Sequence, residues 1–190
     1  MINKQKIVMA ALVAFGMFTA ISGQQITQAQ SNQTPTRSTQ NAIITTDRQF
    51  VIEAARGGKA EVELGKLALQ KAANDDVKQF GQQMVQEHTQ ANNELKQLAA
   101  QKGITLPKDV GAENKEVKAE LSKLSGKAFD QAYINQMVKD HAKTVSLFQR
   151  EAEQGQDEDL KAWATKTLPT LQEHLQRANA IKTQLTATAK

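Results

Sequence analysis

The chain has 190 residues, of which 39% are hydrophobic, 4% aromatic and 23% charged, with three prolines and no cysteine. The length is typical of one domain, and so few aromatic residues argue against the core of a β-sandwich or β-barrel. The absence of cysteine excludes a disulfide scaffold, a thiolate zinc site, an iron–sulfur cluster and a cysteine nucleophile. The formal net charge is +4, but basic and acidic residues are interspersed after residue 29, so we expect no nucleic-acid partner.

Residues 1–29 have the pattern of a secretory signal peptide. Lys4 and Lys6 provide a basic start, and the uncharged apolar run at 7–21 follows. This run is shorter than the ~20 residues that a membrane-spanning helix needs. We therefore expect export to the periplasm or the exterior; the alternative is an uncleaved anchor that tethers the protein to the inner membrane, facing the periplasm. Residues 30–46, rich in Gln, Thr, Ser and Asn, predict a flexible linker.

After the linker, apolar residues recur at spacings of three and four, which predicts α-helices. Turn signals such as Asn74 and Gly155 divide this region into four long helices, and a short amphipathic helix is expected at about 113–124. The pattern predicts an all-α, four-helix bundle over residues 47–186. The connection between the second and third long helices is long enough for a full-length crossover of the ferritin-like kind, or it folds as a cap.

Each of the three histidines lies on the apolar stripe of a different predicted helix. His88 is on the second long helix, His141 on the third and His174 on the fourth, while Glu61 is on the stripe of the first. Counted from the turns, the four residues lie at similar depths. Three imidazoles and a carboxylate inside a helical bundle are a suitable ligand set for one zinc, copper, iron or manganese ion. The alternatives are a polar layer that fixes the register of the helices and an unrecognised small-molecule site.

An acidic residue precedes each histidine: Glu87, Asp140 and Glu173. Adjacent helical residues point about 100° apart, so these acids flank the stripes and can accept a hydrogen bond from the imidazole of a neighbouring helix. The alternative is that they are ordinary solvated residues. The Glu-x-x-His pattern of dinuclear carboxylate sites is absent from all three histidine segments, which argues against diiron chemistry.

Two further local patterns stand out. The segments 83–88 (QMVQEH) and 136–141 (QMVKDH) match, which we interpret as the same environment selecting the same residues. Gly57 and Gly58 lie within the first predicted helix. We expect close helix contact there, with room for a ligand as the alternative.

The segments AEVELGKLA, MVQEH, GKAFDQAYI, KDH and TLPTLQEHL together resemble the family catalogued as domain of unknown function 4142. The resemblance extends over about residues 46–182. It implies an exported bacterial protein with a ferritin-like helical bundle, often labelled a membrane protein, with no established reaction. Glu61, His88, His141 and His174 lie at the family's motif positions, and the resemblance assigns no role to them.

The leading hypothesis is a non-enzymatic module that binds one transition-metal ion through Glu61, His88, His141 and His174. The second is a structural or stress-related protein of the cell envelope that binds no metal and contacts an unidentified protein partner through its exposed helix faces. An oxidoreductase that uses a bound metal is the least favoured, because these residues alone define neither an open coordination position nor a substrate pocket. No catalytic residue is predicted.

Overall fold

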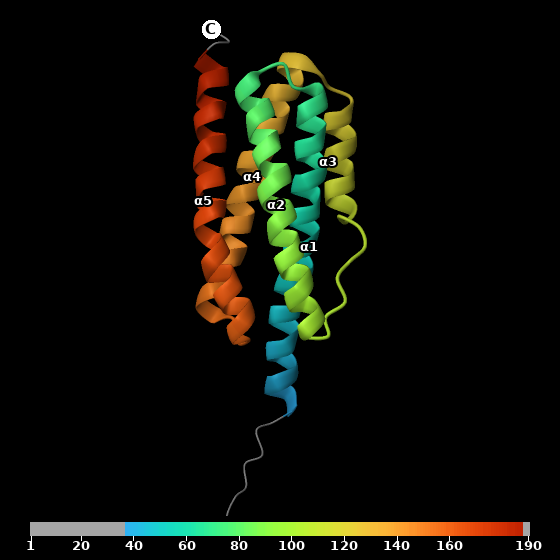
Figure 1. Cartoon of the computed structure of the whole chain (residues 1–190), viewed down its shortest axis with the longest axis vertical. Helices are drawn as coiled ribbons and strands as arrows, with labels where there is room; N and C mark the ends of the chain where they lie inside the picture. The colour runs from blue at the N-terminus through green and yellow to red at the C-terminus, as the bar shows by residue number, and fades with distance from the viewer. Residues whose placement is uncertain (1–36, 188–190) are drawn as a thin grey trace, which may run out of the picture. The chain divides into compact units, whose positions relative to one another are not determined.

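The computed structural model describes residues 37–187, with side chains from residue 45 onward. The predicted signal peptide, residues 1–29, and the first part of the expected linker lie outside the described residues. The described chain forms five helices and no strand (Figure 1): α1 (Arg37–Lys71), α2 (Asp75–Gln101), α3 (Ala112–Ser122), α4 (Gly126–Gln154) and α5 (Glu158–Ala187).

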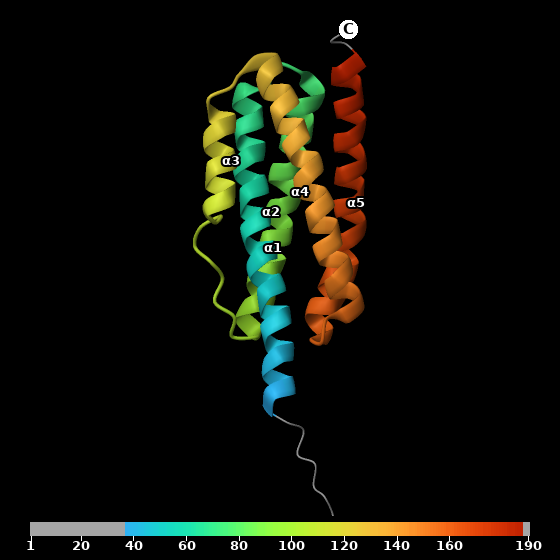
Figure 2. The ribbon, with the colours of Figure 1, turned by 180° about the vertical axis from the view of Figure 1, so that it is seen from behind.

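The four long helices form two antiparallel hairpins, α1–α2 and α4–α5, joined by a crossover. Figures 1 and 2 show that α2 ends at the opposite end of the bundle from the start of α4, and that α3 runs back between these ends alongside α1. The short helix packs against both α1 and α4. The structure confirms the predicted ferritin-like four-helix bundle with a short extra helix. Of the two alternatives for the connection between α2 and α4, it shows the crossover and not the cap.

The first helix begins earlier than we expected. α1 starts at Arg37 and not at about Asp47, so residues 37–46 of the predicted flexible linker are helical. The polar composition of this segment gave no helical period. However, a helix whose later turns are already packed extends at little further cost, because nucleation is the unfavourable step and residues such as Gln40 and Ala42 favour the helix.

The bundle interior holds two apolar clusters, one toward each end. The cluster near the α1–α2 turn includes Phe80 and Tyr133, and the cluster near the α4–α5 turn includes Phe50, Phe148 and Trp163. On each long helix the predicted site residue falls between members of the two clusters: Glu61 between Ala55 and Leu64, His88 between Met84 and Leu95, His141 between Met137 and Val145, and His174 between Leu171 and Ala178. The four residues therefore form one polar layer between two apolar ones.

Two buried aspartates tie each hairpin to the turn of the other. The Asp130 carboxylate on α4 accepts hydrogen bonds from the backbone N–H groups of Ala73 and Asn74, at 3.1 and 3.0 Å. In the same way Asp47, on α1, accepts a hydrogen bond from the backbone N–H of Asp157 at 2.7 Å. Because these bonds satisfy turn groups that the helices leave unpaired, they fix how the two hairpins meet.

A buried carboxyl at the end of α4 gives the fold a pH dependence. Glu151 is 4% exposed, and its Oε1 has no hydrogen-bond partner in the described part of the chain. Burial, with smaller contributions from the Asp47 and Asp157 carboxylates, raises the pKa of Glu151 from 4.5 to about 7. A raised pKa in the folded state means that the free energy of unfolding is highest at acid pH and falls as the pH rises from about 4.5 through about 7.

We expect Glu151→Gln, which imitates the protonated carboxyl, to remove this pH dependence. At about pH 8 the variant should be more stable than the original chain by up to about 3 kcal/mol, and near pH 4 the two should be alike. Urea denaturation across this pH range measures the difference. The exposed Glu153→Gln variant is the control and should follow the original chain; an equal loss of pH dependence in both variants would contradict the assignment to Glu151.

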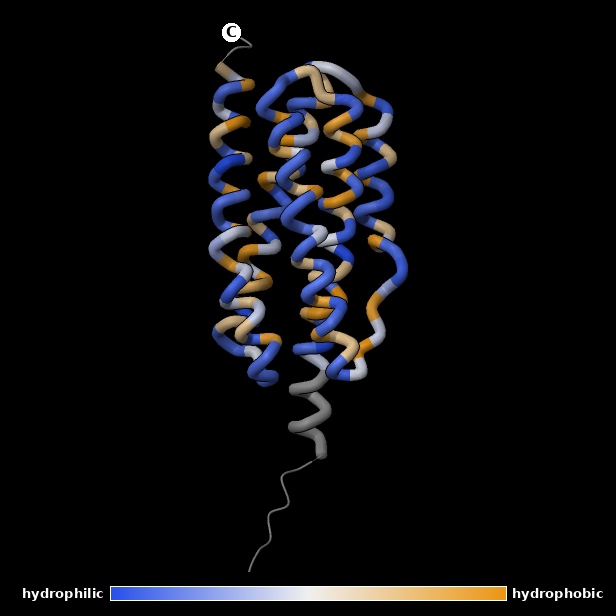
Figure 3. Tube along the Cα trace, viewed as in Figure 1, coloured by the Kyte–Doolittle hydropathy of each residue, from blue (hydrophilic) through white to orange (hydrophobic). Residues whose placement is uncertain are grey.

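No helix in residues 37–187 is both long and apolar enough to cross a lipid bilayer. Figure 3 shows hydrophilic residues interspersed with hydrophobic ones along the helices. This is the pattern of amphipathic helices that pack one face on a shared core.

Candidate metal centre

The bundle brings its three histidines together in the interior. His88 on α2, His141 on α4 and His174 on α5 are all buried, and one ring nitrogen of each lies within 4.8 Å of those of the other two. The ring centroids are 5.3 Å apart for the two pairs that include His174 and 5.7 Å apart for His88 and His141. We call these three side chains the histidine cluster.

Each ring in the histidine cluster keeps one buried nitrogen without a hydrogen-bond partner. These nitrogens are Nε2 of His88, Nε2 of His141 and Nδ1 of His174. The other nitrogen is held in two of the rings: Nδ1 of His141 donates to the Met137 carbonyl at 2.9 Å, and Nε2 of His174 lies 2.6 Å from Oε2 of Glu87. A donor N–H on one side of an imidazole leaves the lone pair of the opposite nitrogen available, as in histidines that bind metals.

The environment favours the neutral form of all three rings. Burial lowers the pKa of His88 well below its usual value, and the two neighbouring imidazoles lower it further. Burial, with His174, lowers the pKa of His141 to about 4, against the opposing effect of the Met137 carbonyl. Burial also lowers the pKa of His174, although Glu87 opposes the shift. A metal ion binds the neutral imidazole, so these rings are already in the form that coordination needs.

Glu61 lies at the edge of the histidine cluster and is not part of it. Its Oε1 is 3.9 Å from Nδ1 of His141, the nitrogen that also faces the Met137 carbonyl. Its Oε2 is buried without a hydrogen-bond partner, and burial, followed by the nearby Asp140 carboxylate, raises the pKa of Glu61 well above its usual value. A nearby cation would offset this cost of burial.

Of the three acids that precede the histidines, one contacts an imidazole. Glu87, next to His88 on α2, accepts its hydrogen bond from His174 on α5, as the sequence predicted for a flanking acid. Asp140 instead accepts a hydrogen bond from the Gln136 side chain at 2.9 Å. Glu173 lines a groove on the surface between α2 and α5.

The matching segments QMVQEH and QMVKDH have a structural explanation. In each, the glutamine donates to the acid four residues later: Gln83 to Glu87 at 3.0 Å, and Gln136 to Asp140 at 2.9 Å. Gln83 also accepts a hydrogen bond from Arg177 on α5. Helical periodicity gave no role to Gln83 or Arg177. The usable signal for Gln83 was a glutamine four residues before an acid in both matching segments.

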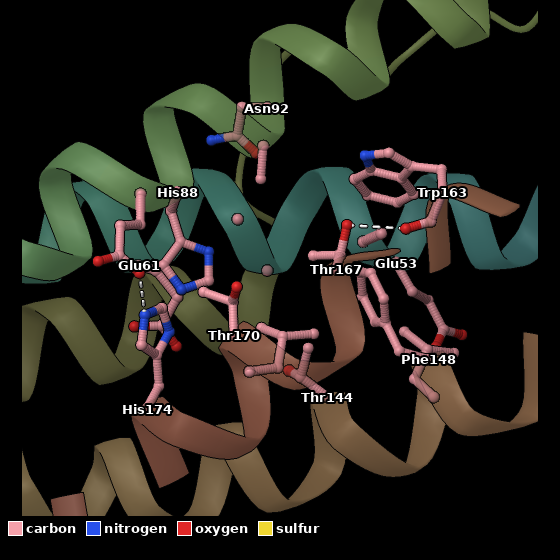
Figure 4. A pocket seen from close by; sticks show the side chains of 17 residues that line it. Glu53, Glu61, His88, Asn92, Thr144, Phe148, Trp163, Thr167, Thr170 and His174 are labelled. Carbon is pink, nitrogen blue, oxygen red and sulfur yellow. Dashed lines mark hydrogen bonds and ion pairs between the residues drawn. The ribbon is translucent and has the colours of Figure 1, made fainter. Parts of the chain in front are cut away.

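A cavity opens on one side of the histidine cluster. Its water-accessible volume is about 50 Å³, and its lining includes Glu61, His88 and His174 but not His141. Figure 4 shows these three side chains at one end of the cavity, with Trp163 and Phe148 at the other. A volume of this size holds a few water molecules.

The two adjacent glycines of α1 differ in their surroundings. A Cβ on Gly58 would lie 2.2 Å from the Asn92 side chain of α2, so Gly58 allows the close contact that we expected. A Cβ on Gly57 would meet nothing within 4 Å, and both glycines line the cavity. Gly58 therefore allows a close helix contact, whereas Gly57 leaves open space beside it.

The fold and the buried cluster define a ferritin-like four-helix bundle with three converging histidines. The chain belongs to the family described as "Domain of unknown function (DUF4142)", whose model matches residues 31–181. None of the curated proteins compared with the chain matches it.

Solved structures with the same fold include two DUF305 proteins. The "putative secreted protein DUF305 from Streptomyces coelicolor" has a TM-score of 0.63 and 12% identity, over 74% of this chain and 92% of the other. The "DUF305 fragment from Deinococcus radiodurans" has a TM-score of 0.65 and 12% identity, over 73% of this chain and 96% of the other. At this level of identity the likeness establishes the fold alone.

We expect Glu87→Ala to weaken binding of a metal ion at the histidine cluster about 10- to 100-fold, because His174 loses the acceptor that orients its ring. Competition with a chromophoric chelator measures the change. The matched control is Glu173→Ala, which removes the acid beside His174 that makes no hydrogen bond to a histidine. If both substitutions lowered the metal affinity equally, the effect would come from the negative charge of the groove and not from the hydrogen bond between Glu87 and His174.

Proposed function

We propose that this protein is a non-enzymatic binding module that holds one transition-metal ion through His88, His141 and His174, with Glu61 beside them. The observation that carries the proposal is the set of three unpartnered, buried imidazole nitrogens, one from each of three helices. Buried nitrogens of this kind cost about 1–3 kcal/mol each when nothing binds them. One cation bound to all three would offset this cost.

A purely structural polar layer accounts for these contacts less well. In such a layer the rings would hydrogen-bond to one another, and partly satisfied buried polar groups are less favourable than an apolar core. In the described part of the chain the imidazole hydrogen bonds go to other groups instead, from His141 to the Met137 carbonyl and from His174 to Glu87. Each ring therefore keeps one nitrogen that can bind a ligand.

The spacing of the nitrogens suits a small first-row ion. An ion at the centre of a triangle with 4.8 Å sides is about 2.8 Å from each corner, and zinc–imidazole bonds are about 2.0–2.1 Å long. Each ring therefore has to move inward by less than about 1 Å. Imidazole ligands favour zinc, copper, iron or nickel over magnesium and calcium.

The test is the metal content of the purified chain after removal of metal with a chelator and dialysis against Zn²⁺ or Cu²⁺. We expect about one equivalent of bound ion, and less than about a tenth of an equivalent in a variant with all three histidines replaced by leucine. Circular dichroism shows whether the variant keeps its helices. A folded original chain that retains no metal would overturn the proposal.

We also propose that the module works outside the cytoplasm. The basic start and apolar run of residues 1–29 support export, and one solved structure with the same fold is named a "putative secreted protein". Fractionation of cells that express the full chain tests this proposal. Recovery in the cytoplasm would contradict it, and recovery with the inner membrane would favour the uncleaved anchor.

A further inference from the structure

We propose that the cavity beside the histidine cluster is a binding site for a small exogenous ligand of the metal: an anion or neutral molecule of two or three heavy atoms with a donor lone pair. This inference rests on the proposed function, because the ligand binds to the ion. It extends that function, because the module would then bind an exchangeable small molecule in addition to the metal ion.

The arrangement of the ligands leaves one side of the ion open. Three imidazole nitrogens occupy three positions of a tetrahedral ion, and sites of this kind keep the fourth position for water or another small molecule. His88 and His174 line the cavity, whereas His141 is not part of its lining. Glu61 also lines it, with an unpartnered Oε2. The cavity is thus where a fourth ligand meets the ion.

The walls of the cavity select by size. Its water-accessible volume of about 50 Å³ admits a molecule of a few heavy atoms and excludes a larger substrate. Most of the wall beyond the histidines is apolar, from side chains such as Ala54, Ala91, Leu147 and Phe148. An apolar wall strengthens the bond between an ion and a polar ligand, because water competes less for both.

Two hydroxyl groups in the wall are free to orient the ligand. Along the described helices many threonine hydroxyls donate to the carbonyl one turn earlier, as those of Thr165 and Thr167 do. Thr144 and Thr170, which line the cavity, make no hydrogen bond among those found in the described part of the chain. Figure 4 shows both side chains between the histidine end and the aromatic end of the cavity.

The cavity shares part of its wall with a groove on the surface, and this shared wall is the route by which we expect a ligand to arrive. This groove, between α2 and α5, has a water-accessible volume of about 400 Å³. Glu87, Ala91, Thr167 and Thr170 line both the groove and the cavity. A small molecule that enters from this groove would pass between these four residues.

The experiment uses the full chain loaded with Co²⁺, whose visible spectrum reports its coordination, and azide as the probe ligand. We expect one equivalent of bound cobalt and a saturable spectral change as azide is added. A chain that binds no cobalt, zinc or copper would remove the proposed function itself. A chain that binds cobalt but whose spectrum ignores a large excess of azide would overturn only the ligand site.

Substitutions in the wall locate the ligand. Gly57→Val adds bulk where a Cβ meets nothing within 4 Å, so cobalt binding should remain while azide affinity falls at least about tenfold. Thr144→Val and Thr170→Val keep the shape but remove the hydroxyls, and each should lower azide affinity about three- to tenfold. Thr165→Val is the matched control, since its hydroxyl faces the Lys161 carbonyl. Unchanged azide affinity in Gly57→Val would place the ligand elsewhere and overturn the inference.

Discussion

Replacing His141 by leucine is expected to lower the affinity for a transition-metal ion about a thousandfold or more. The substitution removes one of three ligands from a site where the loss of an outer hydrogen-bond partner alone costs about 10- to 100-fold. The chain has three histidines and all of them belong to the cluster, so no other histidine can take the place of His141. Titration against a competing chelator of known affinity measures the loss.

The same variant also distinguishes a metal site from a structural polar layer. Without metal, His141→Leu replaces a buried ring with an unpartnered Nε2 by an apolar side chain, so the free energy of unfolding should change little or increase. A structural layer predicts the reverse, a clear loss of stability with no effect of metal. Glu61→Gln and Glu63→Gln form a matched pair on α1, since Glu63 faces outward to Lys118. Only the Glu61 substitution should weaken metal binding.

Binding of metal is expected to stabilise the fold strongly. An ion that binds only the folded chain adds about 4 kcal/mol to the free energy of unfolding at a thousand times its dissociation constant. For a domain of this size, that corresponds to a rise in Tm of about 8–16 °C. The effect should be this direct because α2, α4 and α5 each contribute one ligand, so unfolding of the bundle separates the ligands.

Differential scanning calorimetry with and without Zn²⁺ measures this shift. The His141→Leu variant should show almost none of it, which separates specific binding from a general effect of the ion on the surface. A Tm that Zn²⁺ leaves unchanged in the original chain, or lowers, would contradict a site that exists only in the folded state.

The sequence predicted the helices and the level of the site well, because both depend on periodicity. The apolar stripes placed His88, His141 and His174 on three inner faces, and counting residues from the turns placed them at one depth. The motif resemblance led to the correct family. Length arithmetic allowed the crossover but did not choose it over a cap, since that choice depends on the packing of α3 against α1 and α4.

The finer contacts did not follow from periodicity. An apolar stripe identifies the buried face of a helix, and it locates a residue along the helix axis to within about one turn. A set of metal ligands requires atoms placed within a few ångströms of one another. Glu61 therefore lies beside the histidine cluster and not within it, and Glu87 alone of the three flanking acids contacts an imidazole. Asp47 stands at the expected start of the bundle, yet its carboxylate binds the turn of the other hairpin, across 110 residues of sequence.

X-ray absorption spectroscopy of the chain loaded with one equivalent of Zn²⁺ tests the central claim most directly. The account predicts a first shell with three imidazole nitrogens at about 2.0–2.1 Å and one or two further light atoms. The multiple-scattering pattern of the rings identifies the imidazoles, and the His141→Leu variant should lose it in part. A first shell made of oxygen alone, or one with fewer than two imidazoles, would contradict a metal held by the histidine cluster.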